Sequence, residues 1–271
     1  MWLDNNVNEN KEWVNCVQEY VLSLGYDGPL RTIYRKDSIL LFFKKGNQRY
    51  WLKIYFSAIK RFAESEANVL NHLYNAGCSV PCPVFGKTLY FRGAEGGALL
   101  MNEVRGTKLV YGSSIDLEEL ISEIWRIHKN MKHISFSDIS LTPRDFLSKK
   151  DEKIFSRLGM SSKLGLLRTK YNYMRKQLIH GDIYEDNIFF DGTGVSIIDF
   201  SDMKIGIIEE DIADVVRCVI KYRDYNVEGV MNFIRYYYKD IDAEDILTIA
   251  TYNEAIFGSE NRAKKLSMEK I

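Results

Sequence analysis

The 271-residue chain lacks several features that would assign it to a specialised class of protein. It has no excess charge of either sign, because 37 Lys and Arg residues balance 37 Asp and Glu residues, and this argues against a nucleic-acid partner or an anionic membrane surface. No apolar run approaches the roughly 20 residues that span a bilayer. Its first ten residues, MWLDNNVNEN, are too polar and acidic for a secretory signal peptide. We therefore expect a cytoplasmic protein that binds neither nucleic acid nor membrane.

Cysteine is also scarce, with four residues in the chain. Only Cys78 and Cys82 are close together, and no second Cys or His pair follows them at the spacing of metal ligands. We expect free thiols in a reducing compartment, with no disulfide and no metal at these residues. The remaining composition, 46% hydrophobic and 27% charged, is that of an ordinary globular protein, long enough for one domain or two lobes.

The first hundred residues mix helical and strand-like patterns. Amphipathic helices are expected over about 8–24 and about 58–75. Between them, the runs RTIYR, SILLFF and RYWLKIY are separated by short polar turns, which predicts an antiparallel meander of three strands. A hairpin through KTLYFRGAEGG and the apolar strand ALLM follow, before the pattern changes at NEVRG.

From about residue 113 the pattern becomes mostly helical. Ser113 offers a helix N-cap with Asp116 three residues later. His128 falls on the apolar stripe of that helix, where we expect a core histidine with satisfied hydrogen bonds. Beyond about residue 210 only helical signals remain. Strands first and helices later predict an α+β chain of two lobes.

One segment departs from this generic pattern. LIHGDIYEDNIFF (178–190) places a histidine, a glycine and three carboxylates between two apolar runs, and a DGTG turn links it to a second strand, VSIIDF. A hairpin of this length brings Asn187 and Asp199 to the same end, with Asp182 beside them. Oxygen ligands gathered there suit Mg²⁺, which takes one or two protein carboxylates together with water and phosphate oxygens.

A lysine and a glutamate form a second candidate pair. Lys53 alternates along its strand with Trp51 and Tyr55, and by itself it would be an ordinary exposed lysine. Glu66 shares the apolar face of the second helix, where an unpaired carboxylate is costly. Because such a glutamate needs a partner, we predict an ion pair between Lys53 and Glu66.

These motifs resemble those of the aminoglycoside phosphotransferase and choline kinase group, small-molecule kinases with a bilobal protein-kinase-like fold. Kinases carry an Asp followed five residues later by Asn, and then a metal-binding Asp before Phe. Asp182, Asn187 and Asp199 followed by Phe200 keep that pattern. The resemblance implies that Asp182 is the catalytic residue that accepts the proton of the substrate hydroxyl, and that Asn187 and Asp199 hold Mg²⁺.

For the N-terminal lobe the resemblance implies ATP binding. Lys53, fixed by Glu66, is expected to contact the α- and β-phosphates. ALLMNEVRG resembles the hinge of these kinases, where the Asn102 carbonyl and the Val104 amide would bind the adenine edge. The chain has no G-x-G-x-x-G loop, as is common in this group, and Ser38 is the candidate phosphate contact in the turn between the first two strands.

The architecture implied is an α+β protein-kinase-like fold. Its N-terminal lobe, with an antiparallel sheet and a helix, is expected over 1–101, a hinge over 102–106, and a largely helical C-terminal lobe with the catalytic hairpin over 107–271. Asp211 is expected to brace the hairpin. Gly181 stands where protein kinases carry arginine, and only about ten residues separate Phe200 from Asp211. Both features disfavour a regulated protein kinase.

We therefore predict an ATP- and Mg²⁺-dependent phosphotransferase that moves the γ-phosphate to a hydroxyl group of a small polar molecule. Within 182–214, ten acidic residues stand against the single Lys204. This imbalance favours a cationic acceptor such as an amino sugar or an amino alcohol, although acids that merely cover a surface would look the same.

Tyrosines in the helical tail suggest a further mode of substrate recognition. These residues are Tyr222, Tyr225, Tyr236, Tyr237, Tyr238 and Tyr252. Their rings could cage a quaternary ammonium group, but most are expected to serve packing.

Three alternative functions remain: a metabolic kinase of choline or homoserine type, a compact protein kinase, and a non-catalytic nucleotide-binding regulator. The sequence leaves open the acceptor, the oligomeric state and the choice between ATP and GTP.

Overall fold

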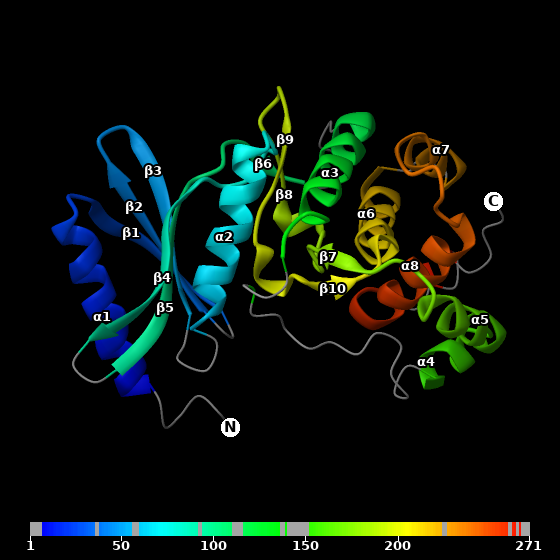
Figure 1. Ribbon diagram of the computed structural model, residues 1–271, viewed down its shortest axis with the longest axis horizontal. Coiled ribbons are helices and arrows are strands. Elements are labelled where there is room, and N and C mark those ends of the chain that lie inside the picture. Colours follow the sequence, from blue (N-terminus) through cyan, green and yellow to red (C-terminus); the bar gives the residue numbers. More distant parts are fainter. Residues whose placement is uncertain are drawn as a thin grey trace. The chain divides into compact units, whose positions relative to one another are not determined.

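The chain divides into two compact units in the computed structural model (Figure 1). Unit 1 comprises residues 1–104 and 134–140, and unit 2 comprises residues 105–133 and 141–271. The structure describes residues 7–35, 38–55, 60–91, 94–109, 116–135, 139, 152–223, 227–259, 262–263 and 266.

Unit 1 is an antiparallel sheet with a helix on each face (Figure 1). The five strands lie in the order β1-β2-β3-β5-β4, so that the first three form the predicted meander and the last two the predicted hairpin. The elements are α1 (Val7–Ser23), β1 (Asp27–Tyr34), β2 (Ser38–Lys45), β3 (Gln48–Tyr55), α2 (Phe62–Asn75), β4 (Pro83–Phe91) and β5 (Ala94–Asn102).

Two successive glycines on β5 let both helices approach the sheet. A Cβ atom on Gly96 would lie 2.3 Å from Nε1 of Trp13 on α1, and one on Gly97 would lie 2.2 Å from the carbonyl oxygen of Lys60, just before α2. Because neighbouring residues of a strand face opposite sides, α1 and α2 cover opposite faces. The main core lies under α1 and includes Trp13, Val17, Val21, Leu41, Phe43, Leu52, Ile54, Ala98 and Leu100.

Unit 2 is largely helical. Helix α6 packs against α8, and α3 packs against α7. Short strands make two small sheets, β6-β8-β9 and β10-β7. The helices are α3 (Leu117–Met131), α4 (Glu152–Arg157), α5 (Ser161–Tyr171), α6 (Ile208–Arg223), α7 (Val227–Tyr237) and α8 (Ala243–Phe257), and the strands are β6 (Thr107–Lys108), β7 (Gln177–Ile179), β8 (Ile188–Phe190), β9 (Val195–Ile197) and β10 (Lys204–Gly206).

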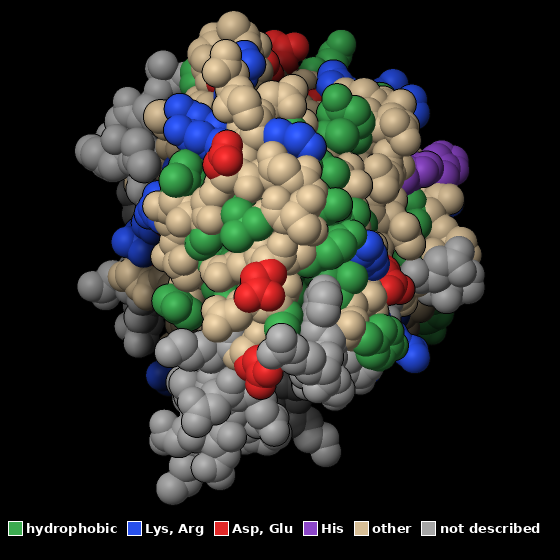
Figure 2. All heavy atoms as spheres, turned by 90° about the vertical axis from the view of Figure 1, so that its left-hand side faces the viewer, with side chains coloured by type: hydrophobic (Ala, Val, Ile, Leu, Met, Phe, Trp, Pro, Cys, Tyr) green, Lys and Arg blue, Asp and Glu red, His purple; other side chains and the backbone are tan. Residues whose placement is uncertain are grey.

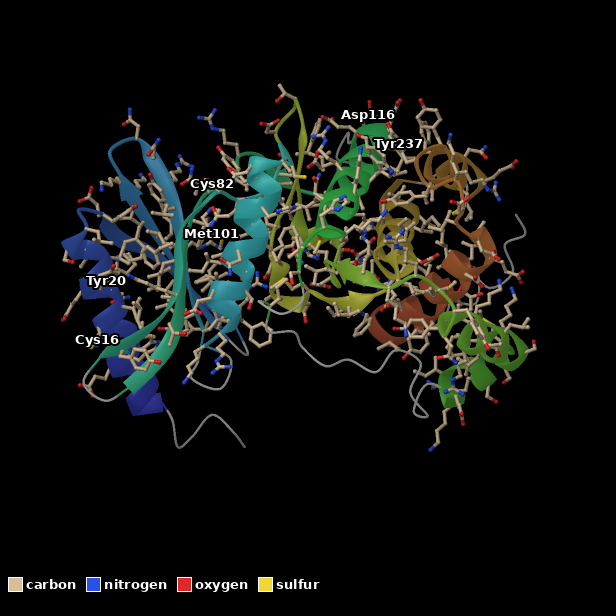
Figure 3. All side chains as sticks on the ribbon, viewed as in Figure 1. Cys16, Tyr20, Cys82, Met101, Asp116 and Tyr237 are labelled. Carbon is tan, nitrogen blue, oxygen red and sulfur yellow. The ribbon has the colours of Figure 1, made fainter. Side chains whose placement is uncertain are left out.

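The start of α3 differs from the prediction. Asp116 is its N-cap, because its carboxylate accepts hydrogen bonds from the backbone N–H groups of Glu118 and Glu119, at 2.8 and 3.4 Å. Figure 3 shows Asp116 at this end of the helix. The expected cap at Ser113 was therefore wrong, and Ser113 itself lies outside the described residues.

Neither the described residues on the face shown in Figure 2 nor the cysteines form a specialised feature. On the face shown in Figure 2, Lys and Arg side chains are interspersed with Asp and Glu. None of the described helices is long and apolar enough to cross a membrane. All four cysteines are free, and Figure 3 shows Cys16 on α1 and Cys82 just before β4.

The α+β, two-unit architecture is confirmed. The boundaries expected for the N-terminal lobe (1–101), the hinge (102–106) and the C-terminal lobe (107–271) stay a prediction.

Candidate active site

The predicted site residues divide between the two units. Those expected to bind the nucleotide lie in unit 1, and those expected to carry catalysis and metal binding lie in unit 2. The first group is Lys53, Glu66, Ser38, Asn102 and Val104, and the second is Asp182, Asn187 and Asp199.

Lys53 and Glu66 form the predicted ion pair. Lys53 Nζ lies 3.2 Å from Glu66 Oε2 and 3.4 Å from Oε1, and both residues are buried, at 3% and 0% exposed. The hydroxyl of Tyr55, on the same face of β3, also donates to Glu66 Oε2. Burial, followed by the Glu66 charge, raises the pKa of Tyr55 well above its usual value, so this hydroxyl stays protonated as a donor. Glu66 therefore holds Lys53 in one orientation through a buried, fully hydrogen-bonded carboxylate.

The other predicted nucleotide contacts lie at strand ends. Ser38 begins β2, is buried and pairs in register with Tyr55; residues 36–37 of the adjoining turn lie outside the described chain. Asn102 ends β5, and its N–H donates to the Cys82 carbonyl at 2.9 Å. Among the described residues, none accepts a hydrogen bond from the N–H of Val104. That amide is thus available to a ligand.

The catalytic hairpin forms as predicted. Strands β8 and β9 pair antiparallel, with Ile188 opposite Ile197 and Phe190 opposite Val195. The turn between them is held by Asp191, whose Oδ1 accepts hydrogen bonds from the N–H groups of the two residues beyond Gly192, at 2.9 and 3.0 Å. The hydrogen bond from Ile198 N–H to the Asn187 carbonyl, at 3.0 Å, continues this pairing. The residues that precede β8 and follow β9 consequently lie at one end of the hairpin.

Asp182 and Asn187 are in direct contact at that end. Asn187 Nδ2 donates to Asp182 Oδ2 at 2.9 Å and to the Asp182 carbonyl at 3.0 Å. Both amide hydrogens are therefore used within the loop, which leaves the Asn187 Oδ1 oxygen as the atom available to a cation. Burial, which outweighs the hydrogen bond from Asn187, raises the pKa of Asp182. A carboxylate with a raised pKa is a better proton acceptor.

Asp199 adopts a backbone conformation that L-residues rarely take. It has φ 65° and ψ 72°, and among the described residues no other non-glycine has a positive φ. This left-handed conformation costs about 1–2 kcal/mol, and such strain concentrates at functional sites. Its Oδ1 accepts a hydrogen bond from Ser201 at 2.7 Å, which fixes the side chain.

Two further carboxylates are close enough to influence Asp182. The charges of Asp202 and Asp199 both contribute to the raised pKa of Asp182. Within the described residues, no three His, Cys, Asp or Glu side chains form a metal cluster by themselves. Asn187 Oδ1 and the Asp199 carboxylate nevertheless fit Mg²⁺, which needs few protein ligands because water and phosphate oxygens complete its shell.

Asp211 holds the backbone just before Asp182. Its Oδ2 accepts from His180 N–H and its Oδ1 from Gly181 N–H, each at 2.8 Å, and His128 Nε2 lies 2.9 Å from Oδ2. Burial alone would raise the pKa of Asp211, but the hydrogen bond and charge of His128 hold it below its usual value. The carboxylate therefore stays ionised while buried. The predicted bracing role of Asp211 and the satisfied core position of His128 are confirmed, since His128 Nδ1 also bonds Tyr238 at 2.8 Å.

His180 serves as a fixed support. Its Nε2 donates to the Ile198 carbonyl at 3.0 Å, and its Nδ1 accepts from Asp182 N–H at 3.2 Å. Because a carbonyl can only accept, the ring carries its proton on Nε2. His180 thus orients the loop by hydrogen bonding, as predicted.

Several residues beside the catalytic loop were not predicted. Lys221 on α6 donates to Tyr184 at 2.8 Å and to Glu185 at 2.7 Å, which ties the loop to α6. Asp202, three residues after Asp199, was also missed, although its position in the same short turn was a usable signal. No signal in the sequence pointed to Lys221, because it lies about thirty-six residues from its partners.

The acidic surplus of 182–214 is smaller in the fold than in the sequence. Four of its ten acids form ion pairs with Lys or Arg side chains. Asp199 and Asp202 remain as carboxylates whose charges act on Asp182. The pairs are Asp186 with Lys108, Glu210 with Lys204, Asp214 with Arg217 and Glu185 with Lys221.

Most of the tail tyrosines described by the structure serve packing, whereas Tyr236 is 73% exposed. Tyr252 stacks on Phe155 with ring centroids 5.0 Å apart, and Tyr238 bonds His128. Tyr236 and Tyr237 contact each other at 5.0 Å. Tyr225 and the side chain of Tyr222 lie outside the described residues. The expectation that most of these rings pack is therefore confirmed for the described ones.

A protein-family model matches the chain over residues 40–244, which is more than half of its length. The model is that of the phosphotransferase enzyme family. The match includes the ion pair of unit 1 and the catalytic hairpin of unit 2. No curated protein matches the chain in sequence.

Solved structures are similar in fold at low sequence identity. Amicoumacin kinase hAmiN has a TM-score of 0.64 at 15% identity, covering 88% of this chain and 86% of that one. Aminoglycoside phosphotransferase APH(3'')-Id from Streptomyces rimosus has a TM-score of 0.62 at 13% identity, covering 89% and 98%. A microcompartment-associated aminopropanol kinase has a TM-score of 0.58 at 14% identity, covering 87% of each chain. These likenesses confirm the predicted kinase-like fold.

Proposed function

The chain belongs to the phosphotransferase enzyme family, and from this premise we propose that Asp182 is the catalytic base of an ATP-dependent kinase. The enzyme transfers the γ-phosphate of ATP to a hydroxyl group of a small molecule. The observation that carries the assignment of the base is the contact between Asp182 and Asn187 at the end of the β8–β9 hairpin.

Lys53 is the proposed phosphate ligand of unit 1. Its ammonium group is held by Glu66 through both carboxylate oxygens, and a fixed cation is what the α- and β-phosphates require. Ser38 would contact phosphate from the start of β2. The Asn102 carbonyl and the open Val104 amide would bind the adenine edge in the proposed hinge, 102–106.

Asn187 and Asp199 are the proposed ligands of Mg²⁺. When bound, the ion neutralises phosphate charge, which is its usual contribution to phosphoryl transfer. The amicoumacin kinase structure contains AMP-PNP and Ca²⁺, and these support the use of ATP and a divalent ion by this chain. The strained backbone of Asp199, at the end of the β8–β9 hairpin that also carries Asn187, supports a functional role for its carboxylate.

Asp182 performs the proton transfer in this proposal. The hydroxyl oxygen of the acceptor forms a bond to the γ-phosphorus, the bond from that phosphorus to the bridging oxygen breaks, and ADP leaves. The hydroxyl proton passes to Asp182, whose pKa is raised by burial. Asn187 and His180 fix the carboxylate and the backbone of Asp182, so alignment is set before the substrate binds.

A cationic acceptor is the proposed substrate class. The carboxylates of Asp199 and Asp202, whose charges act on Asp182, support it, because the three acids favour positive charge nearby. Similar structures are those of kinases for aminopropanol and for aminoglycosides, whose names indicate amine-bearing substrates. We also propose a cytoplasmic location, because ATP is the phosphate donor.

Substitution of the base tests the assignment. We expect Asp182→Ala to lower the rate of phosphate transfer about 10²- to 10⁴-fold, while binding of ATP with Mg²⁺ persists, because the nucleotide contacts lie on other residues. ADP release in a coupled assay measures the rate, and calorimetry measures binding. Asp186→Ala is the matched control, because that carboxylate is 70% exposed and only pairs with Lys108 on the surface. Near-normal turnover by Asp182→Ala would contradict the proposal.

A further inference from the structure

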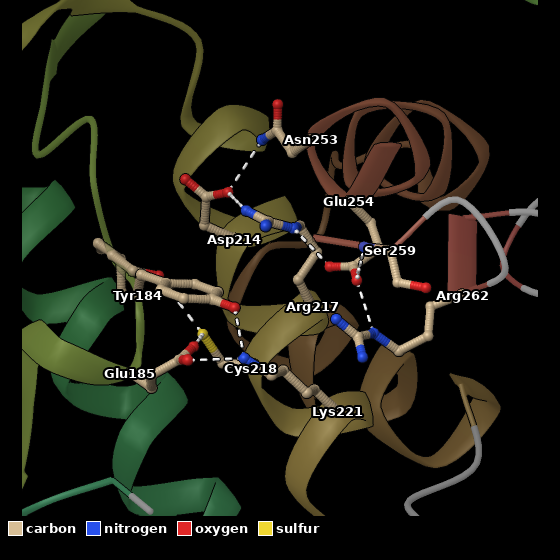
Figure 4. A network of polar contacts seen from close by, with 11 residues as sticks. Tyr184, Glu185, Asp214, Arg217, Cys218, Lys221, Asn253, Glu254, Ser259 and Arg262 are labelled. Atoms are coloured by element: carbon tan, nitrogen blue, oxygen red, sulfur yellow. Dashed lines mark hydrogen bonds and ion pairs between the residues drawn. The ribbon is translucent and has the colours of Figure 1, made fainter. Parts of the chain in front are cut away.

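A polar cluster on α6 and α8 lies beside the catalytic loop and has no part in the chemistry described above. Asp214 Oδ1 accepts hydrogen bonds from Arg217 Nη1 at 2.8 Å and from Asn253 Nδ2 at 2.9 Å. Arg217 also bonds Glu254, at 3.4 Å, and Glu254 bonds Arg262 at 2.6 Å (Figure 4). This network of hydrogen bonds and ion pairs holds Asp214 and Asn253 in fixed positions.

Two oxygen atoms of this cluster remain open. Figure 4 shows one carboxylate oxygen of Asp214 turned away from Arg217 and Asn253. This Oδ2 atom has no hydrogen-bond partner among the described residues, and the same holds for Asn253 Oδ1. Both residues are only partly buried. Two fixed acceptors without donors suit a ligand group that carries several N–H bonds.

The cluster is also incomplete on its donor side. Arg217 is 5% exposed, yet its Nη2 finds no hydrogen-bond partner within the described chain. A buried unsatisfied donor costs about 1–3 kcal/mol. An unsatisfied donor held at this cost indicates that the cluster is arranged for more than its own stability.

The cluster is near the catalytic base. The Asp182 charge contributes to a raised pKa of Asp214, whose main cause is burial and which reaches about 6. The guanidinium carbon Cζ of Arg217 lies 4.9 Å from the ring centroid of Tyr184, which follows Asp182 by two residues. An acceptor whose hydroxyl reaches Asp182 therefore comes within range of Asp214.

The aromatic rings of this region are already engaged. Arg217 lies over Tyr184 and also, at 5.9 Å, over the ring of Phe257. Lys221 Nζ lies 5.1 Å from the Tyr184 centroid. A quaternary ammonium group needs free aromatic faces, because it has no N–H to donate. The surroundings of Asp214 thus offer oxygen acceptors in place of an aromatic cage.

We propose that Asp214, held by Arg217 and Asn253, binds an N–H-bearing ammonium group of the acceptor and so excludes N-methylated amines of choline type. The proposal rests on the proposed function and names its substrate class. Asp214 acts as a specificity-determining residue, with one hydrogen-bonded ion pair to the amine, and Asp182 keeps the chemical step.

Two pairs of acceptors that differ only in N-methylation test the proposal. The first is ethanolamine and choline, and the second is 1-amino-2-propanol and its trimethylammonium analogue. We expect the wild-type enzyme to favour the primary amine of each pair by at least about 10-fold in kcat/KM, since a charged hydrogen bond is worth about that factor. In Asp214→Asn we expect the KM of the primary amines to rise about 10- to 100-fold, while the KM of the methylated amines changes less than about threefold.

Asn253→Ala provides a second variant in case Asp214→Asn folds poorly. It removes one hydrogen bond to Asp214 and should raise the KM of primary amines by a smaller factor, about 3- to 10-fold. Asp240→Asn is the matched control, because Asp240 is an exposed acid of the same unit. Thermal unfolding of each variant shows whether it folds.

A pH profile separates recognition from a structural role. The charges that act on Asp214 are those of Arg217 and Asp211 on its own helix and of Asp182 in the catalytic loop, and Asn253 on α8 donates to it. Glu254 on α8 and the ring of Tyr184 contact Arg217. We expect the KM of ethanolamine to fall as pH rises through about 6, because Asp214 ionises there while the amine stays protonated. In Asp214→Asn that dependence should disappear.

Each contrary outcome identifies what fails. ADP release with other acceptors but with none of the primary amines overturns the role of Asp214 and leaves the kinase assignment intact. Equal KM changes for primary and methylated amines in Asp214→Asn do the same. Absence of ADP release with every acceptor removes both proposals.

Discussion

Gly181 shows at the scale of one residue how tightly the loop before Asp182 is built. It has φ +84°, and a Cβ atom there would lie 2.3 Å from the Asp202 carbonyl oxygen. We expect Gly181→Ala to lower the free energy of unfolding by roughly 2–4 kcal/mol, because a left-handed alanine and an overpacked contact add together. Chemical denaturation measures the change. The same contact explains why arginine cannot occupy this position, because its side chain would collide with the backbone of Asp202.

Gly192 is the matched control for this substitution. It has φ +91° in the hairpin turn, but a Cβ atom there would meet nothing within 4 Å. Gly192→Ala should therefore cost roughly 1–2 kcal/mol, from backbone strain alone. Equal destabilisation by the two alanines would show that the contact with Asp202 has no energetic weight.

Helix α6 acts at the scale of an element by holding the catalytic loop at two points. Asp211 binds the backbone before Asp182, and Lys221 binds Tyr184 and Glu185 after it. We expect Lys221→Met to lower kcat about 10- to 100-fold with little change in the KM of ATP, because a loop released on one side misplaces the base. Steady-state kinetics of ADP release measure both constants.

Lys221→Arg separates positioning from packing. Arginine can donate to both Tyr184 and Glu185 and should restore most of kcat. Lys239→Met, at an exposed lysine of the same unit, should leave the kinetics unchanged. A Lys221→Met enzyme with normal kcat would mean that α6 holds the loop through Asp211 alone.

Carboxylates with raised pKa values govern the pH dependence of stability at the scale of the whole molecule. Burial raises the pKa of Asp214 to about 6 from 3.8, and burial also raises those of Glu209 and Glu210. The folded state therefore takes up protons before the unfolded state does as pH falls, so stability rises between about pH 7 and pH 5. Asp211 has a lowered pKa and acts in the opposite sense, but only below about pH 4.

We accordingly expect the Tm to be a few degrees higher at pH 5 than at pH 7. Asp214→Asn should reduce this difference, because the amide does not titrate, and Asp240→Asn should preserve it. Thermal unfolding followed by circular dichroism measures both. A Tm that falls steadily from pH 7 to pH 5 would contradict this expectation.

The sequence by itself determined the features that depend on short spacing. The β8–β9 hairpin followed from two apolar runs and a DGTG turn, and the family followed from the spacing of Asp182, Asn187 and Asp199. The ion pair of Lys53 and Glu66 was also predictable, because a glutamate on an apolar helix face needs a partner on the neighbouring strand.

Only the tertiary structure decided which acids are neutralised and which stay open. Asp186 pairs with Lys108, 78 residues away, and Asp214 bonds Asn253, 39 residues away. Such partners meet because helices and loops pack together, and no local periodicity records their approach. Charge within a segment therefore overstates the charge of a site, and the open oxygen of Asp214 became visible only once its neighbours were in place.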